Sequence, residues 1–195
     1  MTSYDGTLSL RDARKRYFRD NAFGDDGGYA KKWVKVQLGP LPLAFPNSAA
    51  RVRAVRYHDL HHVVTGYATN VAGEAEIGAW EIGSGCAGFV AAWILNLYAM
   101  VLGFLSCHSG AVWRAFLRGR RTRNLYRIAY DDVLLDSPLA RTRAQLGLDA
   151  PIAQQTTTLA ERAAFVGWSA VAIALALMTA TLLLSPLWIF IRAVV

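Results

Sequence analysis

Only two of the 195 residues are cysteines, Cys86 and Cys107. They bracket an apolar stretch, and two lone cysteines at that spacing match neither a zinc motif nor a redox motif, which favours packing roles over a disulfide. The N-terminal segment MTSYDGTLSLRDARKRYF is charged and lacks an apolar core, so we expect no cleavable secretory signal. Internal repeats and low-complexity tracts are also absent. The sequence therefore excludes a disulfide scaffold, a cysteine-rich zinc module and a repeat array.

Charge is absent from two long stretches, residues 82–113 and 163–191. About 20 apolar residues span the hydrocarbon core of a bilayer, so both stretches are long enough to cross it. The second stretch is apolar on every face of a helix and has a tryptophan near each end, so it is predicted to be a transmembrane helix. The first stretch contains Asn96 and more small residues. It is either a second span or a buried helix of the domain.

The net charge of +7 is concentrated directly after the first apolar stretch. Six arginines lie there, at positions 114, 118, 120, 121, 123 and 127. Such a run is compatible with nucleic-acid binding or with a solvated helix face. Because it adjoins an apolar stretch, we interpret it as a cytoplasmic segment that faces anionic lipid headgroups, and we expect no nucleic-acid partner.

The fold is predicted to be mainly α-helical, in four regions. They are an N-terminal helix and β-hairpin (1–46), a helical metal-binding domain (47–150), a polar linker (151–162) and the transmembrane helix (163–191). Near the end of the domain, two short helices are expected on either side of Ser137-Pro138, in LYRIAYDDVLL and SPLARTRAQLGL.

Turn and capping residues predict where the first elements begin and end. Alternating apolar residues on both sides of Gly39-Pro40 predict the hairpin. Ser48 is a suitable N-cap and Gly66 a suitable C-terminal stop for a helix between them. A second helix is predicted to begin near Asn70 and to continue without a strong break into residues 82–113.

The first of these helices contains the most informative sequence, RVRAVRYHDLHHVVTG. Val55 and its neighbouring valines mark the buried face. At 100° per residue, His58, Asp59 and His62 fall within about 60° of that face. Burying two imidazoles and a carboxylate on an apolar face costs free energy unless they have partners, and a metal ion satisfies all three.

Glu74 supplies a fourth ligand only if the chain reverses direction between Gly66 and Asn70. The metal site then lies between two antiparallel helices. On one continuous helix Glu74 would lie about 24 Å from His58, and no site would form. The reversal is therefore a structural requirement of the metal interpretation. Glu81 lies further along the second helix and is a candidate partner for a ligand rather than a ligand itself.

A single histidine on a helix is usually a core or surface residue, but three histidines and an aspartate within five positions favour a metal site. His61 points away from the others, and we predict that it lies behind the ligands or carries protons. The segment from His58 to His62 also matches the HxxHH box of membrane di-iron desaturases. Those enzymes use several such boxes to hold two irons. This chain has only four histidines, too few ligands for such a site, so we reject the di-iron interpretation.

The pattern His58-Asp59-x-x-His62-x11-Glu74 resembles the signature of the ubiquinone (coenzyme Q) biosynthesis protein 4 family. The resemblance covers roughly residues 48–149. It implies an all-helical domain in which these four residues bind a divalent metal ion, most often proposed to be zinc, with iron as the alternative. It also implies association with a membrane and with polyprenylated ring intermediates of the quinone pathway.

The resemblance implies one of two functions and assigns no catalytic residue. The chain is expected either to act at the ring carbon that bears the carboxylate, by oxidative decarboxylation, or to serve as a non-catalytic lipid-binding scaffold for other quinone-biosynthesis proteins. His61 replaces an aromatic residue that is common in the family, and the hairpin and C-terminal helix are additions, so a related protein acting on another lipid is a further alternative. The metal-binding domain is expected on the cytoplasmic side of the inner or cytoplasmic membrane.

Overall fold

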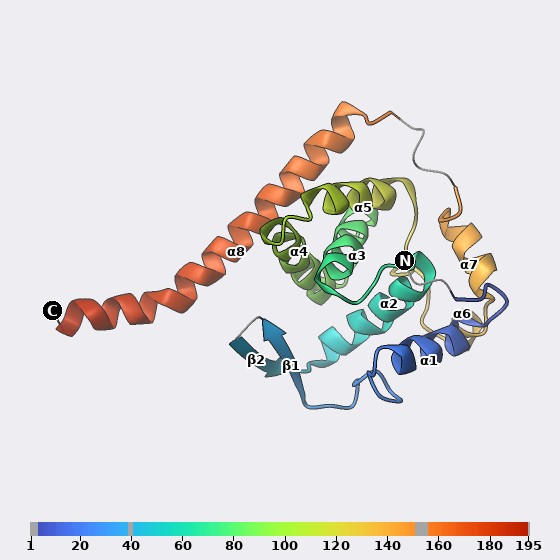
Figure 1. The fold of residues 1–195 in the computed structure, drawn as a ribbon, viewed down its shortest axis with the longest axis horizontal. Coiled ribbons are helices and arrows are strands. Elements are labelled where there is room, and N and C mark those ends of the chain that lie inside the picture. Colours follow the sequence, from blue (N-terminus) through green and yellow to red (C-terminus); the bar gives the residue numbers. More distant parts are fainter. Residues whose placement is uncertain (1–3, 39–40, 151–155, 195) are drawn as a thin grey trace.

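The computed structural model describes residues 4–38, 41–150 and 156–194. In this part of the chain, eight helices and one antiparallel hairpin confirm the mainly helical class with an N-terminal hairpin and an apolar C-terminal helix (Figure 1). The elements are α1 (Leu10–Asp20), β1 (Trp33–Leu38), β2 (Leu41–Pro46), α2 (Ala49–Thr65), α3 (Val71–Ser84), α4 (Val90–Leu105), α5 (Ser109–Arg121), α6 (Asp132–Leu135), α7 (Leu139–Leu146) and α8 (Leu159–Val194).

Side-chain caps set the starts of the first helices, and the cap of α2 is the predicted one, Ser48. The hydroxyl of Ser9 accepts a hydrogen bond from the amide of Asp12, and the hydroxyl of Ser48 caps α2 in the same way. Gly66 ends α2 with a φ of 75°, a conformation that favours glycine. Asn70 then caps α3. The break between α2 and α3 that the metal interpretation required is therefore present.

The predicted continuous helix from Asn70 through the apolar stretch is wrong. α3 ends at Ser84, and α4 begins only at Val90. Gly85 and Ala87 both have positive φ values, 85° and 45°, which interrupt the helical backbone. The break lets α4 turn back and pack against α3.

The first of the two short helices predicted on either side of Ser137-Pro138 is smaller than expected. α6 covers four residues of LYRIAYDDVLL, and the residues before it form turns and loops. The reason is that backbone groups there bind side chains instead of helical partners. The amide of Leu125 donates to Nε2 of His61, and the amide of Tyr126 donates to Oδ1 of Asn124.

α3 is the central helix of the domain, because α4 and α5 both pack along it. Two glycines allow α3 and α5 to approach closely. A Cβ atom on Gly119 would lie 2.2 Å from the carbonyl oxygen of Trp80, and one on Gly83 would lie 2.4 Å from that of Phe116. Both aromatic side chains are fully buried. A glycine on each helix, lying against the backbone of a buried aromatic residue on the other, thus makes the close α3–α5 contact possible.

The substitution Gly119→Ala is expected to lower the free energy of unfolding by roughly 2 kcal/mol, because backbone must move to admit the new methyl group. Gly110→Ala on the same helix is the matched control. Its Cβ would approach only the end of the Arg114 side chain, at 3.5 Å, so the protein should be unchanged or stabilised by up to about 1 kcal/mol. Urea unfolding in mild detergent measures both. Equal stabilities would contradict the close helix contact.

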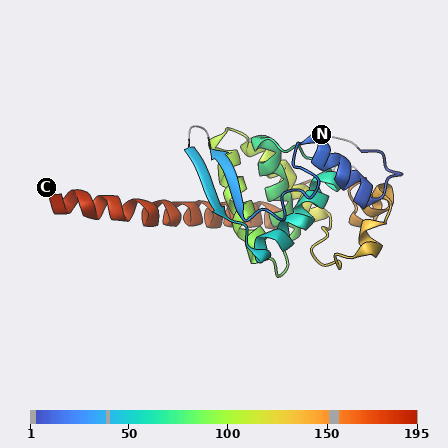
Figure 2. The same ribbon diagram turned by 90° about the horizontal axis from the view of Figure 1, so that it is seen from below.

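α8 lies across the domain along its first half and then extends away from it (Figures 1 and 2). In the described part of the chain it is the one helix that is long and apolar enough to cross a bilayer, as judged by length and composition over Leu159–Ser185. It begins four residues before the predicted boundary at residue 163, so the last part of the predicted linker is helical. Residues 151–155 of that linker lie outside the described residues.

A partly buried ion pair fixes the start of α8 against α5. The guanidinium of Arg121 donates two hydrogen bonds to the carboxylate of Glu161, at 2.7 and 2.9 Å. Glu161 also accepts a hydrogen bond from the amide of Thr158, whose hydroxyl accepts in return from the amide of Glu161. This reciprocal capping box starts the helix, and the ion pair holds it in place.

The first turn of α8 is expected to lose stability in acid, because Glu161 then loses the charge that pairs with Arg121. Hydrogen bonds from Arg121 and from the Thr158 amide lower the pKa of Glu161 from 4.5 to about 2. A carboxyl with a lowered folded-state pKa stabilises the fold above its unfolded-state pKa, and this contribution is lost as the pH falls from about 4.5 towards 2. The difference in melting temperature between the unchanged protein and E161Q should therefore shrink over that range. A difference independent of pH would contradict this role.

Candidate metal centre

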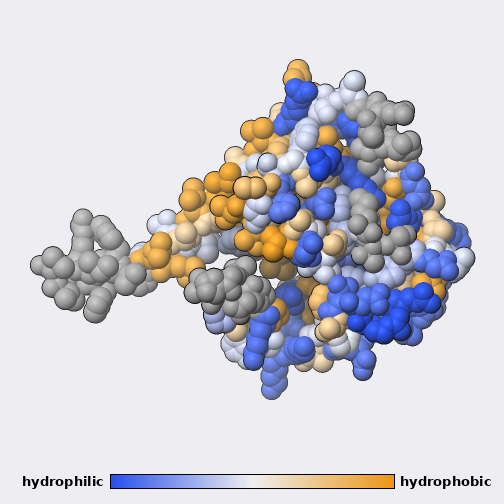
Figure 3. Space-filling view, viewed as in Figure 1, coloured by the Kyte–Doolittle hydropathy of each residue, from blue (hydrophilic) through white to orange (hydrophobic). Residues whose placement is uncertain are grey.

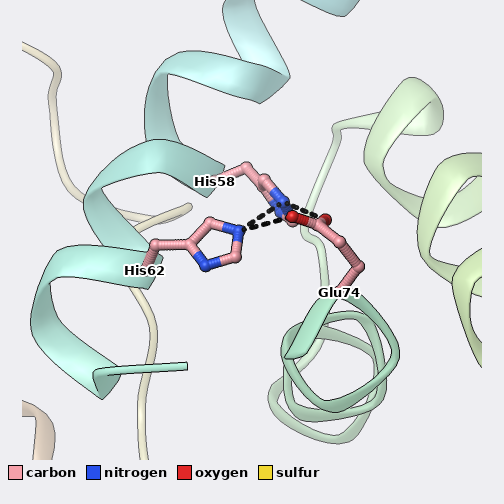
Figure 4. Close-up of side chains that lie close together, drawn as sticks. All are labelled: His58, His62 and Glu74. Atoms are coloured by element: carbon pink, nitrogen blue, oxygen red, sulfur yellow. Dashed lines mark hydrogen bonds and ion pairs between the residues drawn. The ribbon is translucent and has the colours of Figure 1, made fainter. Parts of the chain in front are cut away.

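The side chains of three candidate ligands, His58, His62 and Glu74, meet between α2 and α3 (Figure 4). Nε2 of His58 and Nε2 of His62 each lie 3.3 Å from a different oxygen of the Glu74 carboxylate, and they are 3.2 Å from each other. The two histidines share a face of α2 because they are four residues apart. Glu74 reaches them from the first turn of α3, which is seen end-on in Figure 4 while α2 crosses the view, so the two helices meet at a steep angle.

A partner on the other ring nitrogen fixes the orientation of each histidine. Nδ1 of His58 donates to Oε1 of Glu81 at 2.9 Å, and Nδ1 of His62 donates to the carbonyl oxygen of Tyr67 at 3.0 Å. Carboxylate and carbonyl oxygens only accept, so the proton of each neutral ring is assigned to Nδ1. Both rings therefore present an Nε2 lone pair to the carboxylate of Glu74.

This donor set fits a divalent cation. Two lone pairs and a carboxylate lie within 4.8 Å of one another, and these acceptors repel each other unless a positive charge lies among them. Neutral imidazole and carboxylate are ordinary ligands of zinc and of ferrous iron. The His58, His62 and Glu74 group could therefore hold a metal ion.

Glu81 is the centre of a buried hydrogen-bond network behind the ligands. Its carboxylate is fully buried, and it accepts hydrogen bonds from four donors. They are Nδ1 of His58 at 2.9 Å, Nδ1 of His61 at 2.8 Å, Nδ2 of Asn96 at 2.5 Å and the hydroxyl of Tyr126 at 2.5 Å. We call these five residues the Glu81 network. It connects α2, α3, α4 and the loop before α6, and it fixes the orientation of the His58 ring.

His61 belongs to this network and not to the ligand group, as the sequence predicted. Its Nδ1 donates to Glu81, and its Nε2 accepts a hydrogen bond from the amide of Leu125 at 3.0 Å. Both ring nitrogens are thus occupied, and the side chain is fully buried. Burial lowers the pKa of His61, so the ring is neutral.

Neighbouring charges shift the pKa values of the residues at the centre. Burial alone would lower the pKa of His58, but Glu81 and Glu74 together raise it well above its usual value. Burial would raise the pKa of Glu74, yet His58 and His62 lower it to about 2. For Glu81, burial is similarly outweighed by His58 and His61, and its pKa is held well below the usual range. A metal ion at this position would therefore compete with a proton for Nε2 of His58.

Asp59, the fourth predicted ligand, lies outside the three-residue group. Its carboxylate accepts hydrogen bonds from the hydroxyl of Tyr29 at 2.5 Å and from that of Tyr17 at 3.5 Å. Burial raises the pKa of Asp59, and the hydrogen bond from Tyr29 partly opposes this. Its role as a ligand stays a prediction, because coordination would require the carboxylate to turn away from the two tyrosines.

A cavity of about 190 Å³ opens beside His62. Tyr17 of α1 forms one wall, with its ring stacked on that of His62 at a centroid distance of 5.4 Å. Asn21, Tyr67 and Thr69 contribute polar groups to the lining. Of the three residues of the group, only His62 belongs to this lining, and its side chain is 1% exposed, so the cavity adjoins the group without including His58 or Glu74.

Apart from Glu81 and His61, the residues around the ligands were not apparent from the sequence. Tyr17 and Tyr29 come from the N-terminal region, and Asn96 and Tyr126 come from an apolar helix and a loop. None has a characteristic spacing from the histidines. The one available signal was Asn96, a lone amide in an apolar stretch, which the structure pairs with the buried carboxylate of Glu81.

The fold and the site define a helical protein with a candidate His–His–Glu metal centre. Comparison with known protein families, with curated proteins and with solved structures found no match to this chain. The interpretation of the site therefore rests on its own residues.

Proposed function

We propose that this chain is a membrane-associated metal-binding protein of ubiquinone (coenzyme Q) biosynthesis that acts on polyprenylated ring intermediates by oxidative decarboxylation of the ring. The observation that carries the proposal is the meeting of His58, His62 and Glu74, in which Nδ1 of each histidine has a partner and Nε2 of each faces the carboxylate. Their spacing, with Asp59 beside them, resembles that of the ubiquinone biosynthesis protein 4 family. Zinc is the favoured metal, and iron is the alternative.

In this proposal each group at the centre has a defined part. His58, His62 and Glu74 would hold the ion, and Asp59 would add a fourth ligand after turning from the tyrosines. When bound, the ion would act as a Lewis acid towards negative charge on the ring carboxylate or phenolate oxygen. Replacing a ring carboxylate by a hydroxyl group releases carbon dioxide and consumes an oxidant. Because zinc is redox-inert, a zinc-containing protein would need its oxidant from another source.

The exposure of two proposed ligands, 40% for the Glu74 side chain and 20% for that of His58, favours an enzyme over a purely structural metal site. Catalytic metal centres keep one position open to substrate, whereas structural centres are closed by protein ligands. The walls of the cavity beside His62 include the stacked ring of Tyr17 and the polar side chains of Asn21 and Thr69, which suit the oxygen substituents of a ring.

The apolar helix α8 supports the membrane part of the proposal. A polyprenyl tail partitions into lipid, so a protein that handles prenylated rings benefits from attachment to the bilayer. The arginines of α5 and the following loop, of which Arg114, Arg120, Arg123 and Arg127 are exposed, favour a cytoplasmic position for the domain.

The alternative is a lipid-presenting scaffold in which a closed metal site only joins α2 to α3.

Deleting the gene and analysing prenylated precursors tests the proposed pathway. A carboxylated prenyl-ring precursor should accumulate, and the unchanged protein and E76Q should reverse this while E74Q does not. Unaltered quinone and precursor levels in the deletion strain would exclude the proposed pathway. Identification of the lipid that co-purifies with the full chain gives an independent readout of the substrate class.

A further inference from the structure

α8 cannot cross a bilayer without bringing part of the domain into the lipid. Its uncharged stretch, residues 163–191, is bounded by Arg162 and Arg192. A span of the hydrocarbon core, about 30 Å, requires about 20 residues of helix. Twenty residues that end before Arg192 begin near Ala172, which is only 1% exposed because it packs on the domain.

The contacts between α8 and the domain continue well into this stretch. The ring of Trp168 stacks on Trp93 of α4 at 4.8 Å, and the hydroxyl of Thr179 hydrogen-bonds that of Tyr98 at 2.5 Å. Only the twelve residues 180–191 lie beyond the Thr179 contact and before the next charge, and they span about 18 Å. About eight residues of α8 that lie against α4 must therefore also be within the hydrocarbon core.

The outer face of α4 is apolar, as a surface in contact with the hydrocarbon core must be. α4 contains no charged residue, and its exposed side chains are all apolar. At 100° per residue they fall in one arc of about 140°. They are Val90 (68% exposed), Ile94 (42%), Leu95 (37%), Leu102 (37%) and Leu105 (75%). Asn96, the one amide of the helix, points the other way and is bound to Glu81. Figure 3 shows that the hydrophobic surface of α8 continues onto the domain where α4 lies.

Basic residues at the end of α5 lie beside the start of the apolar stretch of α8. The Arg121–Glu161 ion pair places the end of α5 beside the first turn of α8, where Arg162 also lies. Exposed Arg120 and Arg123 flank that position. The basic residues therefore sit at the end of α8 where its apolar stretch begins, which is the level expected for anionic headgroups.

From these observations we infer that the exposed face of α4 is embedded in the lipid bilayer beside α8. The domain is then sunk into the membrane through α4, not merely tethered to it by α8. This inference rests on the membrane association proposed above, but it does not depend on the metal or on the substrate. It also places α4, and through Asn96 the Glu81 network, at the edge of the lipid phase.

Fluorescence quenching by lipids tests this arrangement. In the full chain with exposed Cys107 replaced (C107S) and buried Cys86 retained, one accessible cysteine at a time is introduced by I94C or L102C on α4 and labelled with an environment-sensitive dye. L182C on the free part of α8 is the control for lipid contact. V133C on α6, where the side chain is 80% exposed, is the control for water. Each protein is reconstituted into phosphatidylcholine–phosphatidylglycerol vesicles that carry nitroxides on their acyl chains.

Both α4 probes should be quenched to at least half the extent seen at Leu182, while the probe at Val133 is unaffected. Quenching at Leu182 alone, with water-like emission from α4, would overturn the inference and leave the membrane helix intact. Shielded but unquenched α4 probes would also overturn it, and would show that a second copy of the chain covers this face. Absence of quenching at Leu182 would overturn the inference together with the membrane association. Circular dichroism checks that each variant is folded, and two α4 positions guard against a local defect.

Discussion

Replacing Glu81 by glutamine is expected to lower the free energy of unfolding by about 3 kcal/mol or more, as for other buried charges that lose their pairing. One carboxylate accepts four hydrogen bonds, from His58, His61, Asn96 and Tyr126. A glutamine of the same size keeps one acceptor oxygen and turns an N–H donor towards groups that are themselves donors. Buried donors are then left without partners, which destabilises the fold. Urea unfolding of the detergent-solubilised protein measures the change.

The same substitution should weaken metal binding, because His58 loses the partner that orients its ring. Loss of such a partner typically reduces metal affinity by about 10- to 100-fold. E76Q is the matched control, since Glu76 lies on the same helix and outside the Glu81 network. It should change the unfolding free energy by less than about 0.5 kcal/mol and leave metal affinity unaltered. Equal behaviour of E81Q and E76Q would show that the network has no such role.

Replacing Glu74 by glutamine is expected to remove the stabilisation that metal gives to the fold. For the unchanged protein, zinc at 100 times its dissociation constant should raise the free energy of unfolding by about 2.7 kcal/mol. E74Q lacks the negative charge that faces His58 and His62, so the affinity should fall at least about 100-fold. At the same zinc concentration the gain should then be at most about 0.4 kcal/mol. Thermal unfolding with and without zinc measures both, and a full zinc response in E74Q would contradict the assignment.

The folding of the E74Q protein also distinguishes an enzyme with a catalytic metal site from a scaffold with a structural one. An open catalytic site predicts that E74Q folds, with the stability of the metal-free unchanged protein, and fails only in the reaction. A metal that joins α2 to α3 as a structural element predicts that E74Q does not fold. The large buried core around Trp80 and Phe116 favours the first result, because the fold does not depend on the metal for its hydrophobic burial.

Much of the architecture was predictable because local signals set it. Ser9, Ser48 and Asn70 cap their helices, and Gly66 ends α2 in the left-handed conformation that glycine tolerates. The four-residue spacing of His58 and His62 puts both on one face of a helix through the helical repeat alone. The uncharged C-terminal stretch likewise had only one reasonable structure, a long apolar helix.

The rest depends on contacts between distant parts of the chain. No local rule placed Tyr17 on the ring of His62, or Tyr29 on the carboxylate of Asp59, because α1 and α2 meet only in the folded domain. The break at Gly85 was missed because the apolar residues on both sides continue a helical pattern. The packing of α4 onto α3, which requires the break, is a tertiary effect that overrides local propensity.

The most direct test of the metal centre is the metal content of the purified full chain, measured by mass spectrometry for the unchanged protein, E74Q and E76Q. The contacts of His58, His62 and Glu74 predict about one divalent ion per chain in the unchanged protein and in E76Q, and close to none in E74Q. No stoichiometric metal in the unchanged protein, or equal metal in all three, would contradict the metal centre and the function built on it.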